Sequence, residues 1–230
     1  MREASLPVSN GMKTLQEIYA EYNVMPSLQL HQLRVAAVAK IICDNLGKSL
    51  DERTVVLACL FHDMGNIIKA DLVYFPEFVE PKGLEYWERI KAEFVAKYGT
   101  NHHAANVAIA REIGLPNASI TLIDSISFSQ LAEVVADDSY ERKVMQYADI
   151  RVGPHGVLSL KERLLEGKER YRATRTERPY YETDKELEHL ARAAEQLEQQ
   201  VFAKARITPE GITDKAIESI IEELREYPIA

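Results

Sequence analysis

The chain has 230 residues, of which 46% are hydrophobic and 28% are charged, and its formal net charge is −8. This length and composition are those of an ordinary globular protein with a core of useful size, and the acidic balance argues against a protein that binds nucleic-acid polymers through a basic surface. No signal peptide is evident and no apolar stretch is long enough to span a bilayer, so we expect a cytoplasmic protein that does not associate with membranes.

Apolar residues recur at helical spacing along nearly the whole chain, which predicts an all-α fold. After a short first helix around Leu15 to Tyr22, the predicted helices cover about 28–46, 49–64, 84–98, 101–113, 117–127, 139–151 and 158–172. Cys43 and Cys59 fall inside these apolar patterns, and without a CxxC pair they are interpreted as buried, reduced thiols.

Several residues predict where the first helices begin and end. Pro26 is expected to end the first helix, and Ser27 is expected to cap the second. Ser49, followed by Glu52 three residues later, has the spacing of a capping box and is expected to open the third helix. Gly65 is expected to end it.

The stretch from about 66 to 82 differs from the rest of the chain because prolines and aromatic residues interrupt the helical pattern. A connection of this length is unusual within a compact domain, and such loops often serve as lids. We therefore expect an ordered loop that covers a site.

The C-terminal part is predicted to be a helical extension, residues 156–230, packed on a main domain formed by residues 1–155. An apolar stripe with steps of three and four marks one helix of this extension; it consists of Leu187, Leu190, Ala194, Leu197 and Val201. A final amphipathic helix includes Ile217 and Leu224. Apolar helix faces usually pack on a core of the same chain. A stripe of two heptads could instead form the interface of a homodimer, so both interpretations are kept.

Four side chains of metal-ligand type lie on apolar helix faces. His31 shares a face with Val35, His62 and Asp63 come at the end of an apolar run, and Asp149 ends another helix. A carboxylate buried without a partner is costly, and a metal ion would offset that cost. Two imidazoles with two carboxylates form a mixed site that suits Mn, Fe, Co, Ni, Zn or Mg.

The order of these residues resembles the HD-domain superfamily of metal-dependent phosphohydrolases. The segments that carry the resemblance are LQLHQLRVAAVAKII, VVLACLFHDMGNIIKAD and VMQYADIRVG, within about residues 12–155. The resemblance implies an HD-type helical bundle and assigns the metal ligands to His31, His62, Asp63 and Asp149. It also implies hydrolysis of a phosphoester by a metal-activated water.

His102 and His103 lie where some HD subfamilies place ligands for a second metal ion, so the resemblance allows one or two ions. The alternatives are that these histidines are exposed in the first turn of their helix or that they contact a substrate phosphate.

Differences from known subfamilies narrow the expected activity. Hydrolases of guanosine alarmones carry HDxxED, whereas this chain has Asn66 and Ile67 after the metal pair. The bacterial nucleotidase branch carries acids three and eight residues after the HD aspartate, and this chain keeps only the second, Asp71. The GYP signature of the signalling-dinucleotide phosphodiesterases is absent from the sequence. We therefore expect Asp63 or Asp71 to accept the proton of the attacking water.

Basic residues near the ligands are candidates for binding the phosphate of a small substrate, either a nucleotide or another phosphoester. They are Arg34, Lys69, Arg151 and His155. Two other functions stay open at this point: a diiron oxygenase, which would engage both His102 and His103, and a non-catalytic module that binds nucleotides or metal.

Overall fold

The computed structural model describes residues 13–47, 49–174 and 184–229, and over these residues the protein is all-α, as predicted. Eleven α-helices and four short 3-10 helices make up this part of the chain, which contains isolated bridges but no strand. The elements are α1 (Leu15–Glu21), α2 (Pro26–Asn45), α3 (Glu52–Phe61), η1 (Asn66–Ile68), η2 (Pro76–Val79), α4 (Leu84–Tyr98), α5 (His102–Ile113), α6 (Asn117–Ser125), η3 (Phe128–Gln130), α7 (Leu131–Ala136), α8 (Tyr140–Arg151), α9 (Leu160–Thr174), α10 (Asp184–Phe202), η4 (Pro209–Gly211) and α11 (Asp214–Arg225).

Two of the predicted helix starts are wrong. Helix α1 ends at Glu21, well before Pro26, and Pro26 is instead the first residue of α2, where no helical hydrogen bond needs the N–H that proline lacks. Ser27 is therefore inside the helix and not its cap. The cap of α3 is Asp51, whose carboxylate accepts a hydrogen bond from the backbone N–H of Thr54 at 3.0 Å, so Ser49 lies outside the helix.

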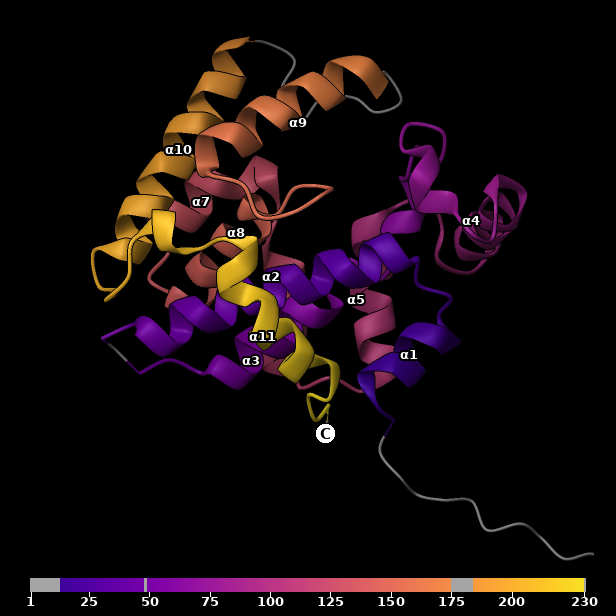
Figure 1. The fold of residues 1–230 in the computed structure, drawn as a ribbon, viewed down its shortest axis with the longest axis horizontal. Helices are drawn as coiled ribbons and strands as arrows, with labels where there is room; N and C mark the ends of the chain where they lie inside the picture. The colour runs from indigo at the N-terminus through magenta and orange to yellow at the C-terminus, as the bar shows by residue number, and fades with distance from the viewer. Residues whose placement is uncertain (1–12, 48, 175–183, 230) are drawn as a thin grey trace, which may run out of the picture.

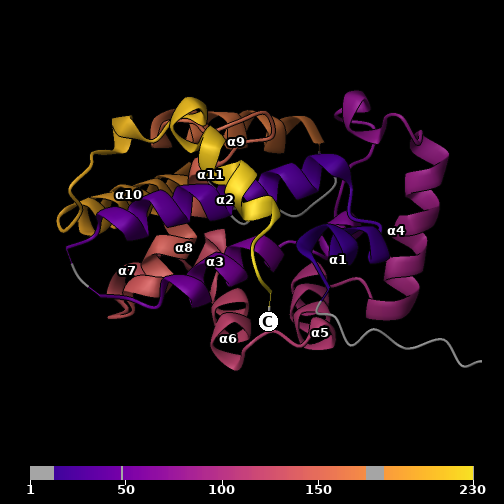
Figure 2. The ribbon, with the colours of Figure 1, turned by 60° about the horizontal axis from the view of Figure 1, so that its bottom comes forward.

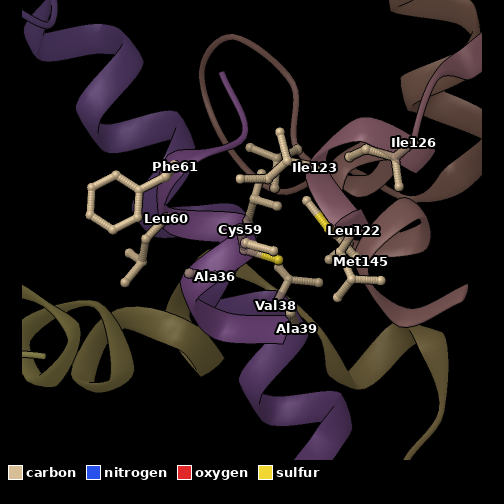
Figure 3. Close-up of a cluster of buried hydrophobic side chains, with 14 of the residues drawn as sticks. Ala36, Val38, Ala39, Cys59, Leu60, Phe61, Leu122, Ile123, Ile126 and Met145 are labelled. Carbon is tan, nitrogen blue, oxygen red and sulfur yellow. The ribbon is translucent and has the colours of Figure 1, made fainter. Parts of the chain in front are cut away.

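Helix α2 lies at the centre of the molecule and packs against α3, α8 and α11 (Figures 1 and 2). Close contact between α2 and α3 is possible because α2 presents small side chains such as Ala36 and Ala39. Figure 3 shows these alanines near Leu60 and Cys59 of α3, with Met145 of α8 in the same cluster. The metal-ligand candidates on α2, α3 and α8 are thus carried by helices that a tightly packed core holds together.

The C-terminal helices pack against the preceding ones. The stripe of α10 is buried against α7 and α8, with Ala194, Leu197 and Val201 fully inaccessible. Helix α11 lies over α2 (Figure 2). Its side chains Ile217 and Leu224 are buried. The stripe is therefore occupied within one chain and is not available as a seam for a second copy.

The loop between α3 and α4 contains η1 and η2 and is ordered by contacts with both α4 and α5. Trp87 of α4 donates a hydrogen bond to the backbone carbonyl of Val79 at 3.0 Å, and Lys91 donates one to the carbonyl of Ala70 at 2.6 Å. None of the helices among the described residues is both long enough and apolar enough to cross a membrane.

Candidate metal centre

The structure brings together His31 of α2, His62 and Asp63 directly after α3, and Asp149 of α8. Asp149 Oδ1 lies 3.3 Å from Nε2 of His31 and 3.3 Å from Nε2 of His62. Asp63 Oδ2 lies 3.5 Å from His31 Nε2 and 3.6 Å from His62 Nε2. Ligand atoms that surround one ion tetrahedrally, each about 2.0–2.2 Å from it, lie about 3.3–3.6 Å from one another, so these distances fit a shared ion.

The orientation of His62 is set by its helix. The side chain is buried at the C-terminal end of α3, and its Nδ1 lies 2.8 Å from the backbone carbonyl of Cys59. Because Nδ1 donates to this carbonyl, Nε2 is the nitrogen that faces the two carboxylates. Metal-binding histidines are commonly oriented in this way, with one nitrogen on the metal and the other on a carbonyl.

The cluster requires a positive charge. Burial opposes protonation of His62, but the charge of Asp63 and the hydrogen bond to Asp149 raise the pKa of this imidazole to about 9. Burial also opposes ionisation of Asp149, yet hydrogen bonds from His31 and His62 hold its pKa well below the usual value. Among the described residues no lysine or arginine lies within salt-bridge distance of either carboxylate. The donor set therefore fits a divalent cation, for which His31, His62 and Asp63 form a suitable group.

Two buried amides hold the turn that carries His62 and Asp63, and sequence reasoning missed both. The side-chain oxygen of Gln32, next to His31 on α2, accepts a hydrogen bond from the backbone N–H of Asp63 at 3.2 Å. The side-chain oxygen of Asn106 on α5 accepts one from the N–H of Gly65 at 2.6 Å. The only signal in the sequence that could have identified these two amides is that each is a polar residue on an apolar helix face. This signal does not indicate which backbone N–H group each amide would bind.

His102 and His103 lie outside the four-residue cluster. His102 Nε2 lies 3.3 Å from Lys69 Nζ, and His103 Nε2 lies 3.1 Å from the backbone carbonyl and 3.3 Å from the carboxylate of Asp124. Burial, followed by the charge of Lys69, lowers the pKa of His102 to about 4, so its imidazole is neutral at physiological pH. The structure thus gives each of these histidines a partner other than the cluster.

A cavity of about 670 Å³ opens above the cluster. His31, Asp63 and Asp149 line its polar part, together with Asn66, Lys69, Asp71, His102 and His103. The loop contributes aromatic side chains, Tyr74, Phe75 and Phe78, and α9 contributes Arg163 and Arg170. The loop therefore forms a wall of this cavity, and a volume of this size is typical of small-molecule sites.

Three of the four basic residues proposed for phosphate binding do not line this cavity. Arg34 faces α11, with its Nε 3.6 Å from Asp214 Oδ1. Arg151 is only 2% exposed, and its guanidinium donates to Tyr147 and to the backbone carbonyls of residues 158, 209 and 212. Both predictions are corrected for the same reason: each arginine is engaged by a C-terminal segment that is distant in sequence.

The predicted role of His155 in phosphate binding is the third to be corrected. Its exposed ring packs against Phe75 and Phe78 of the loop, with centroid distances of 5.3 and 5.5 Å, and its Nε2 lies 3.8 Å from Glu77 Oε1. It therefore contacts side chains of the loop but does not line the cavity, whereas Lys69 alone of the four does.

The family model described as HD domain matches residues 29–151 of the chain. This range begins just before His31 and ends just after Asp149, so it contains all four residues of the cluster. No curated protein and no solved structure matches the chain.

Proposed function

The chain belongs to the HD-domain family, the superfamily of metal-dependent phosphohydrolases, and from this premise we propose that it hydrolyses a small phosphoester in the cavity above His31, His62, Asp63 and Asp149. The observation that carries the proposal is the group of two imidazoles and two carboxylates, in which Nε2 of each imidazole lies 3.3–3.6 Å from an oxygen of each carboxylate, at the base of a cavity open to small molecules.

The four residues would hold a divalent ion: Mn, Fe, Co, Ni, Zn or Mg. The chemistry that such an ion supplies when bound is Lewis acidity toward a phosphoryl oxygen and a lowered pKa for water. His62 is positioned for this role by the carbonyl of Cys59, and Asp63 by the turn that Gln32 holds. The partly exposed carboxylates of Asp63 and Asp71 line the cavity and are the candidates for accepting the proton of the attacking water.

The substrate that we propose is a nucleotide or another small phosphoester. Lys69 supplies positive charge to the cavity wall, and charge-assisted hydrogen bonds to phosphate oxygens are strong. The apolar side chains of the loop, with Tyr74 and Phe75 half-buried, would cover the non-phosphate part of the substrate and exclude water. We retain a cytoplasmic location as part of the same proposal.

The two alternatives differ in their structural support. A diiron oxygenase would need His102 and His103 as ligands, but Lys69 and Asp124 are the partners of these imidazoles. A non-catalytic binding module would have the same cluster and cavity, so turnover must distinguish it from a hydrolase.

The test is a panel of phosphoesters offered to the purified protein with each divalent metal supplied separately. We expect turnover of at least one ester. His62→Ala should lose both metal and turnover, whereas His189→Leu, which alters an exposed histidine of α10, should keep both. A folded, metal-loaded wild-type protein that binds phosphoesters and hydrolyses none of them would contradict the proposal and favour the binding module.

A further inference from the structure

The Lys69 ammonium lies in a wall shared by two cavities. It lines the cavity above the cluster and also a second cavity of about 660 Å³ between the loop and helices α4 and α5. Within the part of the chain that the structure describes, no carboxylate lies within 4.0 Å of this ammonium. A lysine that lines a cavity without an acidic partner is available to bind an anion.

The backbone around Lys69 is held on both sides. The N–H of Lys69 donates to the carbonyl of Asn66 at 3.2 Å and ends η1. The next residue, Ala70, accepts a hydrogen bond from Lys91 of α4 at 2.6 Å. The remaining freedom of Lys69 is therefore in its long side chain, which has many rotamers and loses them when it binds a ligand.

His102 is the residue that restrains this side chain. Its Nε2 lies 3.3 Å from Lys69 Nζ, and because an ammonium can only donate, the imidazole must be the acceptor. The low pKa of His102 agrees with a neutral ring that offers a lone pair at Nε2. His102 itself is placed by the N-terminal turn of α5, where the side chain of Asn101 accepts hydrogen bonds from the N–H groups of His103 and Ala104.

We propose that His102 is a positioning residue that holds the Lys69 ammonium toward the cavity, where Lys69 binds an oxygen of the phosphoryl group, and that His102 is not a metal ligand. This role rests on the proposed function, since the anion is the phosphoryl group of the substrate. A second ion bound by His102 would have to displace Lys69 from this lone pair.

The test uses inorganic phosphate as the probe and calorimetric binding to the metal-loaded full-length protein as the measurement. Lys69→Met should weaken phosphate binding about 10- to 100-fold, the loss expected for one charge-assisted hydrogen bond. His102→Leu should weaken it about 3- to 10-fold through loss of preorganisation. The double variant should bind no more weakly than Lys69→Met alone, because His102 acts only through Lys69.

Controls separate positioning from folding and from metal binding. His102→Gln, which retains an acceptor, should recover part of the affinity, and thermal melting should show that each variant is folded. Lys97→Met and His189→Leu change an exposed lysine and an exposed histidine elsewhere and should bind phosphate as the wild type does. Metal content should be equal in His102→Leu and wild type.

Three results would overturn the inference: loss of metal from His102→Leu, wild-type phosphate affinity in Lys69→Met, or additive losses in the double variant. Failure of the proposed function has a different signature. Wild-type protein that hydrolyses no phosphoester but binds phosphate with the predicted dependence on Lys69 and His102 would support the positioning role and refute hydrolysis.

Discussion

Replacing Arg151 by alanine should destabilise the fold while leaving substrate binding by the folded protein unchanged. The guanidinium is almost completely buried and donates to the backbone carbonyl of Leu158 and to the hydroxyl of Tyr147. It also donates to the carbonyls of Pro209 at 3.3 Å and Ile212 at 3.2 Å, next to the start of α11. The side chain thus ties the end of α8 to two later segments of the chain.

The size of the effect follows from what alanine leaves behind. Tyr147 keeps a partner because its hydroxyl also donates to Glu198 at 2.6 Å. The carbonyl of Ile212 lies in a buried residue and would lose its charged donor. Leaving a buried acceptor without its donor costs about 1–3 kcal/mol, a large part of the total stability of a domain.

The assay is equilibrium unfolding in urea, with phosphate binding measured on the folded variant. Arg206→Ala is a matched control, because among the described residues the exposed side chain of this arginine donates one hydrogen bond, to the carbonyl of Asp44, and its loss should cost less than about 1 kcal/mol. Arg151→Lys should recover only part of the stability, since an ammonium lacks the planar fork of the guanidinium. An unchanged unfolding midpoint together with weakened phosphate binding would refute this reasoning and return Arg151 to the substrate site.

Three further predictions concern the centre itself. Asp63→Ala should lower kcat/KM about 100-fold or more and reduce metal content, and with chelator present its melting temperature should fall, because protonated His62 loses the charge of Asp63 that stabilises it; full turnover would exclude Asp63 from the reaction. Gly65→Ala should lower the free energy of unfolding by about 1–3 kcal/mol, because the new Cβ would lie 2.7 Å from Cβ of Ala105 on α5; unchanged unfolding in urea would show that the turn and α5 can separate freely. In chelated protein, protonated His62 should contribute stability that is complete below its unfolded pKa of about 6.5 and lost as the pH rises through about 9; melting curves that are flat between these values would contradict the raised pKa.

The metal-ligand candidates could be found from the sequence because each belongs to a helix whose apolar face is evident in its neighbours. Helical periodicity places His31 on the face of Val35, and the HD pair ends the apolar run of α3. A polar side chain on such a face must point into the core, so the ligand candidates of different helices come close together once the helices pack. The family pattern then supplied the order of the four residues along the chain.

The basic residues could not be assigned in this way. Proximity in sequence to Asp149 suggested that Arg151 lies at the rim, but two residues along a helix turn the side chain by about 200°, toward a different face. The acceptors that bury this arginine come from residues 209 and 212, which no local pattern connects to α8. Arg34 was misassigned for the same reason, since its partner Asp214 lies in α11.

The contacts of these two arginines bear on how the C-terminal segment relates to the metal centre. The carboxylate of Asp214 accepts hydrogen bonds from the N–H of Val157 and also forms an ion pair with Arg34 of α2. Asp214 therefore links α2 to the turn that follows α8. These two helices carry His31 and Asp149. From the same C-terminal segment, Arg163 and Leu187 line the cavity above them. Residues before about 155 therefore bear the metal-ligand candidates, and residues after it hold their helices in place and complete the cavity wall.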